Sequence, residues 1–275
     1  MSNLCQPGGG ASCGACCGLY NFRDHSRAAI TRVLGRHTER LRDVPRTPEA
    51  FRAAARAIAA EEQPPAFVDV RVCPLLGFLD DGPEGRVGCL GHPLHNGGVD
   101  LRDCGVYDAR TCQSFECPSF LWLSAAEAEW IRAACPDWYL YGLVVTDVAF
   151  VRAIERLVER ALGERLDAAR LLARPEALRA SRRLFALKEA GAEGARGDAL
   201  FGQFGAPPEG AVSTEPVLRT IDYAALGARA APEDEVVLCL SCAPRRLEEL
   251  EAARQQVRDA IAGLVAALSA NEHIA

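Results

Sequence analysis

Apolar positions recur with helical spacing in two segments near the start of the chain. The first segment follows a cap at Asp24 or Ser26 and runs through Ala29, Ile30, Val33 and Leu34. The second starts at Thr47-Pro48-Glu49, where a cap precedes proline at the first helical position and an acid in the first turn. We expect this second helix to end before Pro64-Pro65 and to carry Phe51, Ala54, Ala55 and Ile58.

The pattern becomes more continuously helical after Ser124. Ser124-Ala125-Ala126-Glu127 is a candidate capping box that opens a helix through Trp130 and Ile131. Helical spacing recurs from Asp147, again after Pro175, and over a long amphipathic segment from Pro244. These three helices would carry Val151, Ile154, Leu157, Val158, Ala161 and Leu162; Leu178, Leu184 and Leu187; and Leu247, Leu250, Val257, Ile261, Leu264, Val265 and Leu268.

Little of the chain has the alternating pattern of a β-strand. Val68, Val70 and Val72 alternate with polar residues and predict one short strand leading into Cys73, and Glu235 to Leu240 is a second candidate. Residues 1–24, 73–118 and 191–216 read mainly as loops. We therefore predict a mainly α protein with little β-structure. A loop-rich, metal-organised domain over residues 1–122 would pack on a mainly helical domain over residues 123–275.

Composition and charge limit the class of protein, its compartment and its partners. With 49% hydrophobic and 25% charged residues, the 275-residue chain is typical of globular proteins. A net charge of −6, with one lysine, Lys188, among the 31 basic residues, gives no general attraction to nucleic acid. No secretory signal is apparent, and no stretch approaches the roughly 20 apolar residues of a membrane span. We expect a cytoplasmic protein without membrane or nucleic-acid partners.

The distribution of the twelve cysteines is the most informative feature of the sequence, because most of them cluster in its first 117 residues. Three of them, Cys135, Cys239 and Cys242, follow residue 117. In a reducing compartment such clustering indicates metal binding or catalysis rather than structural disulfides. Glycine-rich loops lie between the clustered cysteines, and thiolates converging on a cation would fix such loops. The nine candidate metal ligands are Cys5, Cys13, Cys16, Cys17, Cys73, Cys89, Cys104, Cys112 and Cys117.

The strongest motif is Cys13-Gly14-Ala15-Cys16-Cys17-Gly18. A CxxC step places two sulfurs within reach of one cation, as in zinc and iron–sulfur sites. Neighbouring side chains point in different directions, so Cys16 and Cys17 cannot easily serve one tetrahedral ion. The pair suggests a polynuclear cluster, or two ions close together. The alternative is a simple zinc knuckle in which Cys17 is buried.

Three further motifs complete a recognisable set. They are Cys73-Pro74-Leu75-Leu76-Gly77-Phe78-Leu79, then Cys104-Gly105-Val106-Tyr107, then Cys112 to Cys117 with Phe115 before the last cysteine. Over residues 5–120 the chain resembles the YkgJ-like cysteine-cluster family, whose domain is described as zinc- or iron-chelating. The segment from Asp108 to Thr111 is shorter than the family pattern and lacks its proline, Gln113 replaces a basic residue, and Cys5 and Cys89 are additional.

Thiolate ligands suit zinc, cuprous copper and iron–sulfur clusters, and disfavour magnesium and calcium. Eight or nine cysteines match two four-coordinate sites, or one cluster and one zinc. His92 and His95 follow Cys89 and could add nitrogen ligands, although we favour ordinary loop histidines. Cys239 and Cys242 also form a CxxC pair, for which we favour a structural role over metal binding or redox chemistry. Cys135 is expected to be a buried residue at a helix end.

Trp138, Tyr139 and Tyr141 form a dense aromatic patch, for which core packing against the cysteine region is the default interpretation. Walker, Rossmann, nucleophile-elbow and HExxH motifs are absent. Our first hypothesis is a multi-cysteine centre that holds iron, as an iron–sulfur cluster, and supports redox chemistry or sensing. The alternative is structural zinc, with a protein partner bound by the C-terminal helices. An enzyme with its active site near Trp138 to Tyr141 is a third reading.

Overall fold

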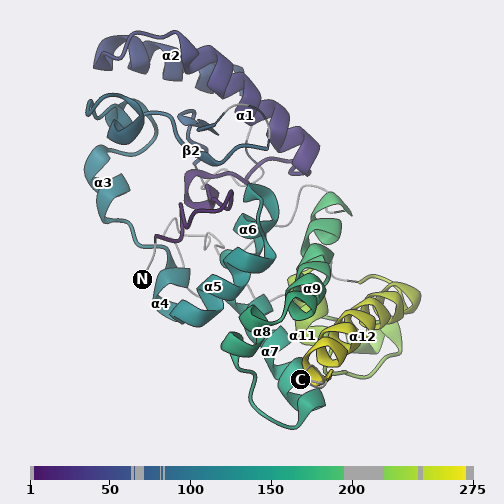
Figure 1. The fold of residues 1–275 in the computed structure, drawn as a ribbon. Helices are drawn as coiled ribbons and strands as arrows, with labels where there is room; N and C mark the ends of the chain where they lie inside the picture. Colours follow the sequence, from purple (N-terminus) through teal and green to yellow (C-terminus); the bar gives the residue numbers. More distant parts are fainter. Residues whose placement is uncertain are drawn as a thin grey trace.

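The computed structural model describes residues 3–62, 65, 71–80, 82, 84–194, 220–240 and 244–270. Helices account for 61% of the structure and strands for 4%, which confirms the prediction of a mainly α protein with little β-structure. In Figure 1, α1 and α2 lie at one end, α6 in the middle, and α9, α11 and α12 at the other end. Among the described residues, no helix is both long and apolar enough to cross a membrane.

In chain order, the elements are η1 (Ala15–Cys17), α1 (Arg27–Arg42), α2 (Pro48–Glu61), β1 (Leu76–Phe78), β2 (Val87–Cys89), η2 (Pro93–His95), η3 (Arg102–Cys104), α3 (Ala109–Ser114), α4 (Pro118–Trp122), α5 (Ala125–Ala134), α6 (Trp138–Val145), α7 (Val148–Leu162), α8 (Ala168–Ala173), α9 (Pro175–Gly194), α10 (Tyr223–Leu226), α11 (Asp234–Cys239) and α12 (Leu247–Ser269).

Capping residues set the predicted helix starts. Ser26 accepts a hydrogen bond from the Ala29 amide at the start of α1, and Thr47 plays the same part for α2, where Pro48 is the first helical residue. Ser124 and Glu127 form the predicted capping box of α5. The predicted helices after Asp147, Pro175 and Pro244 are α7, α9 and α12. In α12 Leu250, Val257, Ile261, Leu264 and Leu268 are buried, whereas Leu247 is 40% exposed.

Two local predictions are wrong. Glu235 to Leu240 is mostly helix α11 rather than a strand. Its short apolar run fits either periodicity, and Asp234 and Glu235 in the first turn favour the helix because they face its positive end. The predicted loop from residue 191 is helical as far as Gly194. Of the predicted strand at Val68 to Val72, residues 66–70 lie outside the described residues, as do residues 195–219 of the predicted loop.

The described strands lie inside the segment that the sequence predicted to be mostly loop. β1 and β2 pair antiparallel, with Leu76 opposite Cys89 and Phe78 opposite Val87. The strands have three residues each, too few for an alternating pattern to stand out in the sequence. Their side chains nevertheless enter the core, since Leu76, Phe78 and Val87 are all buried.

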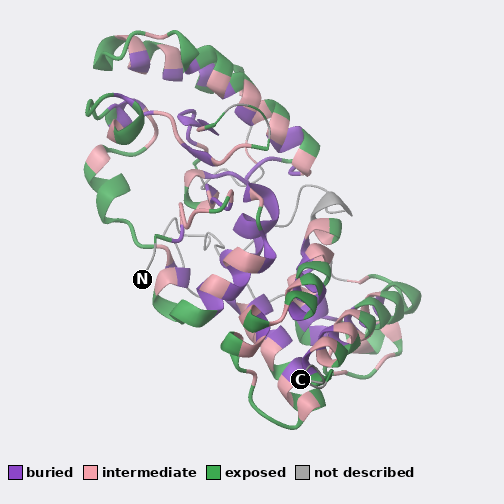
Figure 2. Ribbon diagram, viewed as in Figure 1, coloured by how far each residue is buried: buried purple, intermediate pink, exposed green. Residues whose placement is uncertain are grey.

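Helix α6 joins the cysteine-rich loops to the helical part of the chain, and all eight of its residues are buried (Figure 2). Trp138, Tyr139 and Leu143 pack with Leu19, Phe22 and Leu76, while Leu140, Tyr141 and Val144 belong to the core of α5, α7, α9 and α12. The aromatic patch is therefore core, as expected. The boundary after residue 122 stays a prediction.

Buried hydroxyls fix α6 against the first loop. Tyr20 donates to the carbonyl of Tyr139 at 2.9 Å, and Tyr139 donates to the carbonyl of His25 at 2.7 Å. Tyr141 donates to the carbonyl of Leu4 at 2.9 Å. The Tyr20 ring approaches α6 so closely that a Cβ atom on Gly142 would lie 2.1 Å from its hydroxyl oxygen. Glycine is therefore required at this position, and residues 4–25 are held by backbone contacts to one helix.

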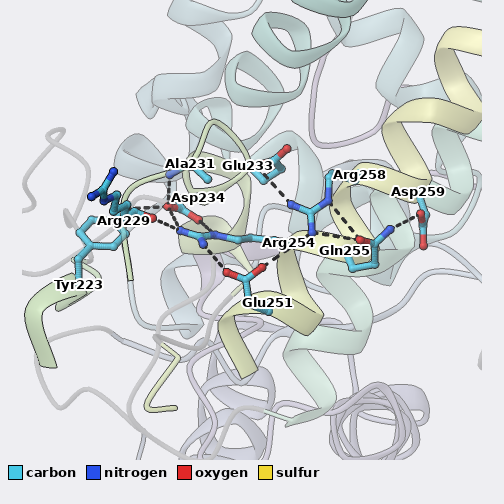
Figure 3. A network of polar contacts seen from close by, with 10 residues as sticks. All are labelled: Tyr223, Arg229, Ala231, Glu233, Asp234, Glu251, Arg254, Gln255, Arg258 and Asp259. Atoms are coloured by element: carbon cyan, nitrogen blue, oxygen red, sulfur yellow. Dashed lines mark hydrogen bonds and ion pairs between the residues drawn. The ribbon is translucent and has the colours of Figure 1, made fainter. Parts of the chain in front are cut away.

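The helical part contains two buried ion pairs. Lys188, the single lysine of the chain, is 1% exposed and pairs with Asp147, the cap of α7, while donating to the carbonyl of Cys239 at 2.5 Å. Arg254 on α12 binds both carboxylate oxygens of Asp234 at 2.7 Å (Figure 3). Burial opposes the charge of Asp234, but the hydrogen bonds from Arg254 lower its pKa. The Asp234 carboxylate is thus held in the ionised form.

The Arg254 network continues to neighbouring elements, as Figure 3 shows. Arg254 also donates to the carbonyl of Arg229 at 2.7 Å and to Glu251 at 2.6 Å. Tyr223 of α10 donates to Asp234 at 2.9 Å. A bidentate buried pair of this kind fixes the angle between α11 and α12, because both partners must stay in register to keep their hydrogen bonds.

Asp234→Asn should destabilise the protein by about 3 kcal/mol, because it removes the buried carboxylate that binds Arg254 and leaves the half-exposed Glu251 as its remaining described counter-charge. The matched control is Glu176→Gln, which breaks an ion pair whose side chains are 66% and 61% exposed and should cost about 1 kcal/mol or less. Urea unfolding of both variants measures the difference. Equal small losses would contradict the assignment of Arg254 as a buried, charge-dependent contact.

Candidate metal centre

The first group of thiols comes from residues 5–16 and from the start of α4. The Cys13 amide donates to the Cys5 carbonyl at 3.0 Å, so the two backbone segments lie side by side across a glycine-rich turn. Cys16, on η1, shares a hydrogen bond with Cys5. Cys117 lies near enough to Cys13 and Cys5 for their charges to interact. This group thus contains Cys5, Cys13, Cys16 and Cys117.

The second group begins at the next residue. Cys17 accepts a hydrogen bond at its carbonyl from the Cys73 amide at 2.9 Å. The approach is tight, since a Cβ atom on Gly18, whose φ is 85°, would lie 2.3 Å from the Arg71 carbonyl oxygen. Only glycine therefore allows residues 71–73 to pass beside η1. The short hairpin then brings Cys89, at the end of β2, to the same cluster as Cys17 and Cys73.

Both groups receive a member from one exposed segment. We call residues 107–117 the strap; it includes α3, and most of its residues are exposed (Figure 2). Cys112 on α3 interacts electrostatically with Cys17, Cys73 and Cys89. Cys117 ends the strap and faces the first group. In Figure 1 the strap runs along one side of the molecule from the η3 region to α4.

Cys104 belongs to the same apolar cluster as Cys17, Cys73 and Cys89, but the described contact of its thiol is with the backbone of α2 rather than with another cysteine. Its thiol is 4% exposed and donates to the Pro48 carbonyl at 3.3 Å, at the start of α2. The described charged neighbours that act on it are Arg52, Asp103 and Glu49. Of the nine predicted ligands, which are all present as thiols, the structure gathers eight into two groups and leaves Cys104 outside them.

Burial and mutual proximity favour the protonated form of these thiols. A hydrogen bond with Cys16 and burial raise the pKa of Cys5, and burial raises the pKa of Cys13 well above its ordinary value. Burial and the nearby Cys73 thiol raise the pKa of Cys89 to about 12. Neighbouring thiols cannot all ionise without a compensating positive charge. A bound cation would supply that charge, and its binding would release protons.

Arg102, which the sequence did not single out, supplies a positive charge beside Cys89 and Cys112. Its side chain is 5% exposed and is held by Asp100 through a hydrogen bond of 2.9 Å. Burial raises the pKa of Cys112, and Arg102 opposes that shift by favouring the thiolate. One guanidinium cannot balance four thiolates. A lone arginine between a loop and a short helix carries no recognisable signal, so it could be identified only from its position in space.

The two candidate histidines lie beside the second group without clear ligand geometry. Their rings are 6.3 Å apart, and Nδ1 of His92 accepts a hydrogen bond from the Leu94 amide at 3.2 Å. Burial and the charge of Arg102 lower the pKa of His92. The hydrogen bond that His92 already accepts fits the favoured interpretation, in which both residues are ordinary loop histidines.

Of the remaining cysteines, the described Cys135 and Cys239 belong to neither group. Cys135 is fully buried at the end of α5, as predicted. The Cys239 thiol donates to the Glu235 carbonyl at 3.2 Å within α11. Its predicted partner Cys242 lies outside the described residues.

The thiols are close but are not arranged as a formed metal site. In the part of the chain that the structure describes, no three His, Cys, Asp or Glu side chains are placed so that they could hold one metal ion. The groups consist instead of hydrogen-bonded and electrostatically coupled thiols. Their chemistry fits a soft cation, since sulfur donors favour zinc, cuprous copper and iron–sulfur clusters. A described hollow of about 310 Å³, lined by residues that include Thr31, Thr38 and Phe78, contains none of these cysteines.

Comparison of the chain with family models, curated proteins and solved structures found no match. The resemblance to the YkgJ-like family, carried by the motifs around Cys13, Cys73 and Cys104, therefore stays a prediction.

The raised thiol pKa values predict that the metal-free protein loses stability in mild alkali. A thiol whose pKa is higher in the folded than in the unfolded chain stabilises the fold fully below the unfolded value, which is 9.0 for a cysteine. That contribution is lost as the pH rises toward the folded value, which is about 12 for Cys89.

At about pH 9.5, each thiol that stays protonated in the folded protein should lower the free energy of unfolding by about 0.8 kcal/mol relative to its value at neutral pH. Urea unfolding of chelator-treated, reduced protein between about pH 7.5 and about pH 9.5 measures the slope. A free energy of unfolding that does not fall over this range would show that the thiols are neither buried nor mutually close.

Proposed function

We propose that this chain is a metal-binding protein whose multi-cysteine centre holds iron, as an iron–sulfur cluster, and serves redox chemistry or sensing. The observation that carries the proposal is the convergence of eight thiols from residues 5–17, 73, 89 and 112–117 on one region. Loop closure over such sequence distances costs free energy, and sulfur–metal bonds readily exceed that cost.

Iron is favoured by the number and exposure of the thiols. A structural zinc site is closed by four ligands and needs no access to solvent. Here Cys16 and Cys112 are exposed, and Cys117 is half-buried, so each group reaches the surface. A surface-accessible cluster can exchange electrons or respond to oxidants, whereas a sealed zinc site would only hold the loops together.

The alternative is structural zinc, with the helical part acting as a protein-interaction module. It is supported by the irregular loops of residues 3–24 and 90–108, which contain few regular hydrogen-bonded elements and would gain rigidity from a tetrahedral ion. The exposed positions of α12 include the acidic residues Glu248, Glu249, Glu251 and Asp259, which could contact a partner of opposite charge. An active site at Trp138 to Tyr141 is not favoured, because these side chains are buried in the core.

The cysteine usage also favours a reducing compartment, and we propose the cytoplasm. Thiols that bind iron or zinc must stay reduced, and closely spaced pairs such as Cys5 and Cys16 would be prone to oxidation elsewhere. Neither nucleic acid nor a membrane is part of the proposal; metal ions are its ligands.

Protein purified without oxygen should be brown, should contain iron and acid-labile sulfide, and should lose its visible absorption when dithionite is added. Replacement of Cys13 and Cys73 by alanine should remove most of the metal, because it removes one thiol from each group. The control is Cys135→Ala, which removes a buried thiol outside the groups and should keep the metal content unchanged.

Elemental analysis, expressed as atoms per chain, measures each case. Colourless wild-type protein with stoichiometric zinc would reject the iron proposal in favour of the structural alternative. Protein that binds neither metal, with or without reconstitution, would reject both.

A further inference from the structure

We propose that the clustered cysteines form two adjacent four-thiolate sites, and that the boundary between them falls between Cys16 and Cys17. This inference rests on the proposed metal-binding function and adds the division of ligands. The first site takes Cys5, Cys13, Cys16 and Cys117, and the second takes Cys17, Cys73, Cys89 and Cys112.

Backbone contacts define the core of the first site. The hydrogen bond of 3.0 Å between Cys13 and Cys5 fixes these two residues on neighbouring segments of the loop. The 3.4 Å contact from the Ala15 amide to the Cys13 sulfur points that thiol toward η1, which carries Cys16. Cys16 completes a hydrogen bond with Cys5, and Cys117 adds the fourth thiol from the start of α4.

The second site is built on a different part of the chain. The 2.9 Å hydrogen bond from Cys73 to Cys17 fixes one edge, and a 2.7 Å hydrogen bond from the Leu90 amide to the Leu75 carbonyl fixes the hairpin that carries Cys89. Cys17, Cys73 and Cys89 also pack in one apolar cluster. Cys112 faces all three from the strap.

The boundary follows from the geometry of adjacent residues. Cys16 and Cys17 stand next to each other on a single turn of 3-10 helix, so their side chains leave the backbone in different directions. Cys16 is exposed and meets Cys5, whereas Cys17 is half-buried and packs beside Cys73. The hydrogen bond between Cys16 and Cys17 is the described contact that joins the two groups. Two neighbouring ions therefore fit better than one shared by all eight thiols.

The strap closes both sites. Cys112 and Cys117 lie five positions apart on this exposed segment, and each joins its group from the outer side. Metal–sulfur bonds of about 2.3 Å would draw the strap toward the loops at two points. In the structure as it stands, no set of three thiols in the described part could hold an ion, so loading requires the loop thiols as well as this segment to move closer together.

The full-length reduced chain can be titrated with zinc under anaerobic conditions, with native mass spectrometry counting ions per chain and a competing chelator reporting affinity. Wild type should bind two ions. Cys112→Ser and Cys117→Ser are chosen because these two side chains lie on the exposed strap, so the variants should fold. Each should weaken one ion at least about tenfold and leave the other unchanged, since loss of a direct ligand should cost no less than loss of an outer-sphere partner.

Cys104→Ser is the matched control, because Cys104 belongs to the same part of the chain but donates to Pro48 instead of another cysteine. It should retain both ions at wild-type affinity. The double variant of Cys112 and Cys117 should weaken both. Cobalt loading checks the partition, because each single variant should lose tetrahedral thiolate absorption from one site only.

Hydrogen exchange over residues 107–117 supplies a readout that does not depend on counting metal. Zinc should protect the strap in wild type and in Cys104→Ser, and should protect it less in either strap variant. A wild-type chain that binds one ion, or single variants that each lose all metal, would overturn the partition while leaving metal binding itself intact. A chain that takes up no zinc, cobalt or iron would overturn the proposed function as well.

Discussion

The cysteine-rich part of this protein depends on one close passage of two backbone segments. Residues 71–73 run beside η1 with the Cys73 amide bonded to the Cys17 carbonyl, and this passage is open only because residue 18 is glycine. A side chain there would meet the Arg71 carbonyl, push the segments apart and separate Cys17 from Cys73. The hairpin that carries Cys89 follows directly from this segment, so its position depends on the same contact.

Helix α6 connects the cysteine-rich loops to the rest of the fold. Because it is buried on all sides, it can contact the first loop through Tyr20 and the helical core through Val144 at the same time. Its tyrosine hydroxyls donate hydrogen bonds to the carbonyls of Leu4 and His25 in the irregular loop. The loops around the thiols are therefore anchored on one side by a rigid helix, while the strap on the other side stays exposed.

The sequence predicted α1, α2, α5, α7, α9 and α12, because they have a clear helical period or a start signal such as Thr47-Pro48 and the capping box at Ser124. It did not identify the shorter helices α3, α4, α6, α8 and α10. It failed for α11, whose short apolar run has no unique periodicity, and for the three-residue strands, which are too short to show one. The motifs identified the clustered cysteines but could not assign them to the two groups. Spacing does not reveal that Cys16 and Cys17 are assigned to different groups, that Cys104 turns toward α2, or that Arg102 lies beside Cys112. Such relations arise from loops that meet only in three dimensions.

The burial of Lys188 has a separate consequence for the chemistry of the surface. It is the sole lysine among 275 residues, and its ammonium group is enclosed by Asp147, the Cys239 carbonyl and the ring of Phe150. Arginine supplies every other Lys-or-Arg position, and guanidinium groups do not undergo the acylation reactions of amines at neutral pH. Ubiquitin transfer or acetylation at a side-chain amine would thus require α7 and α9 to separate first. In the folded state the side chains of this protein are shielded from that whole class of modification.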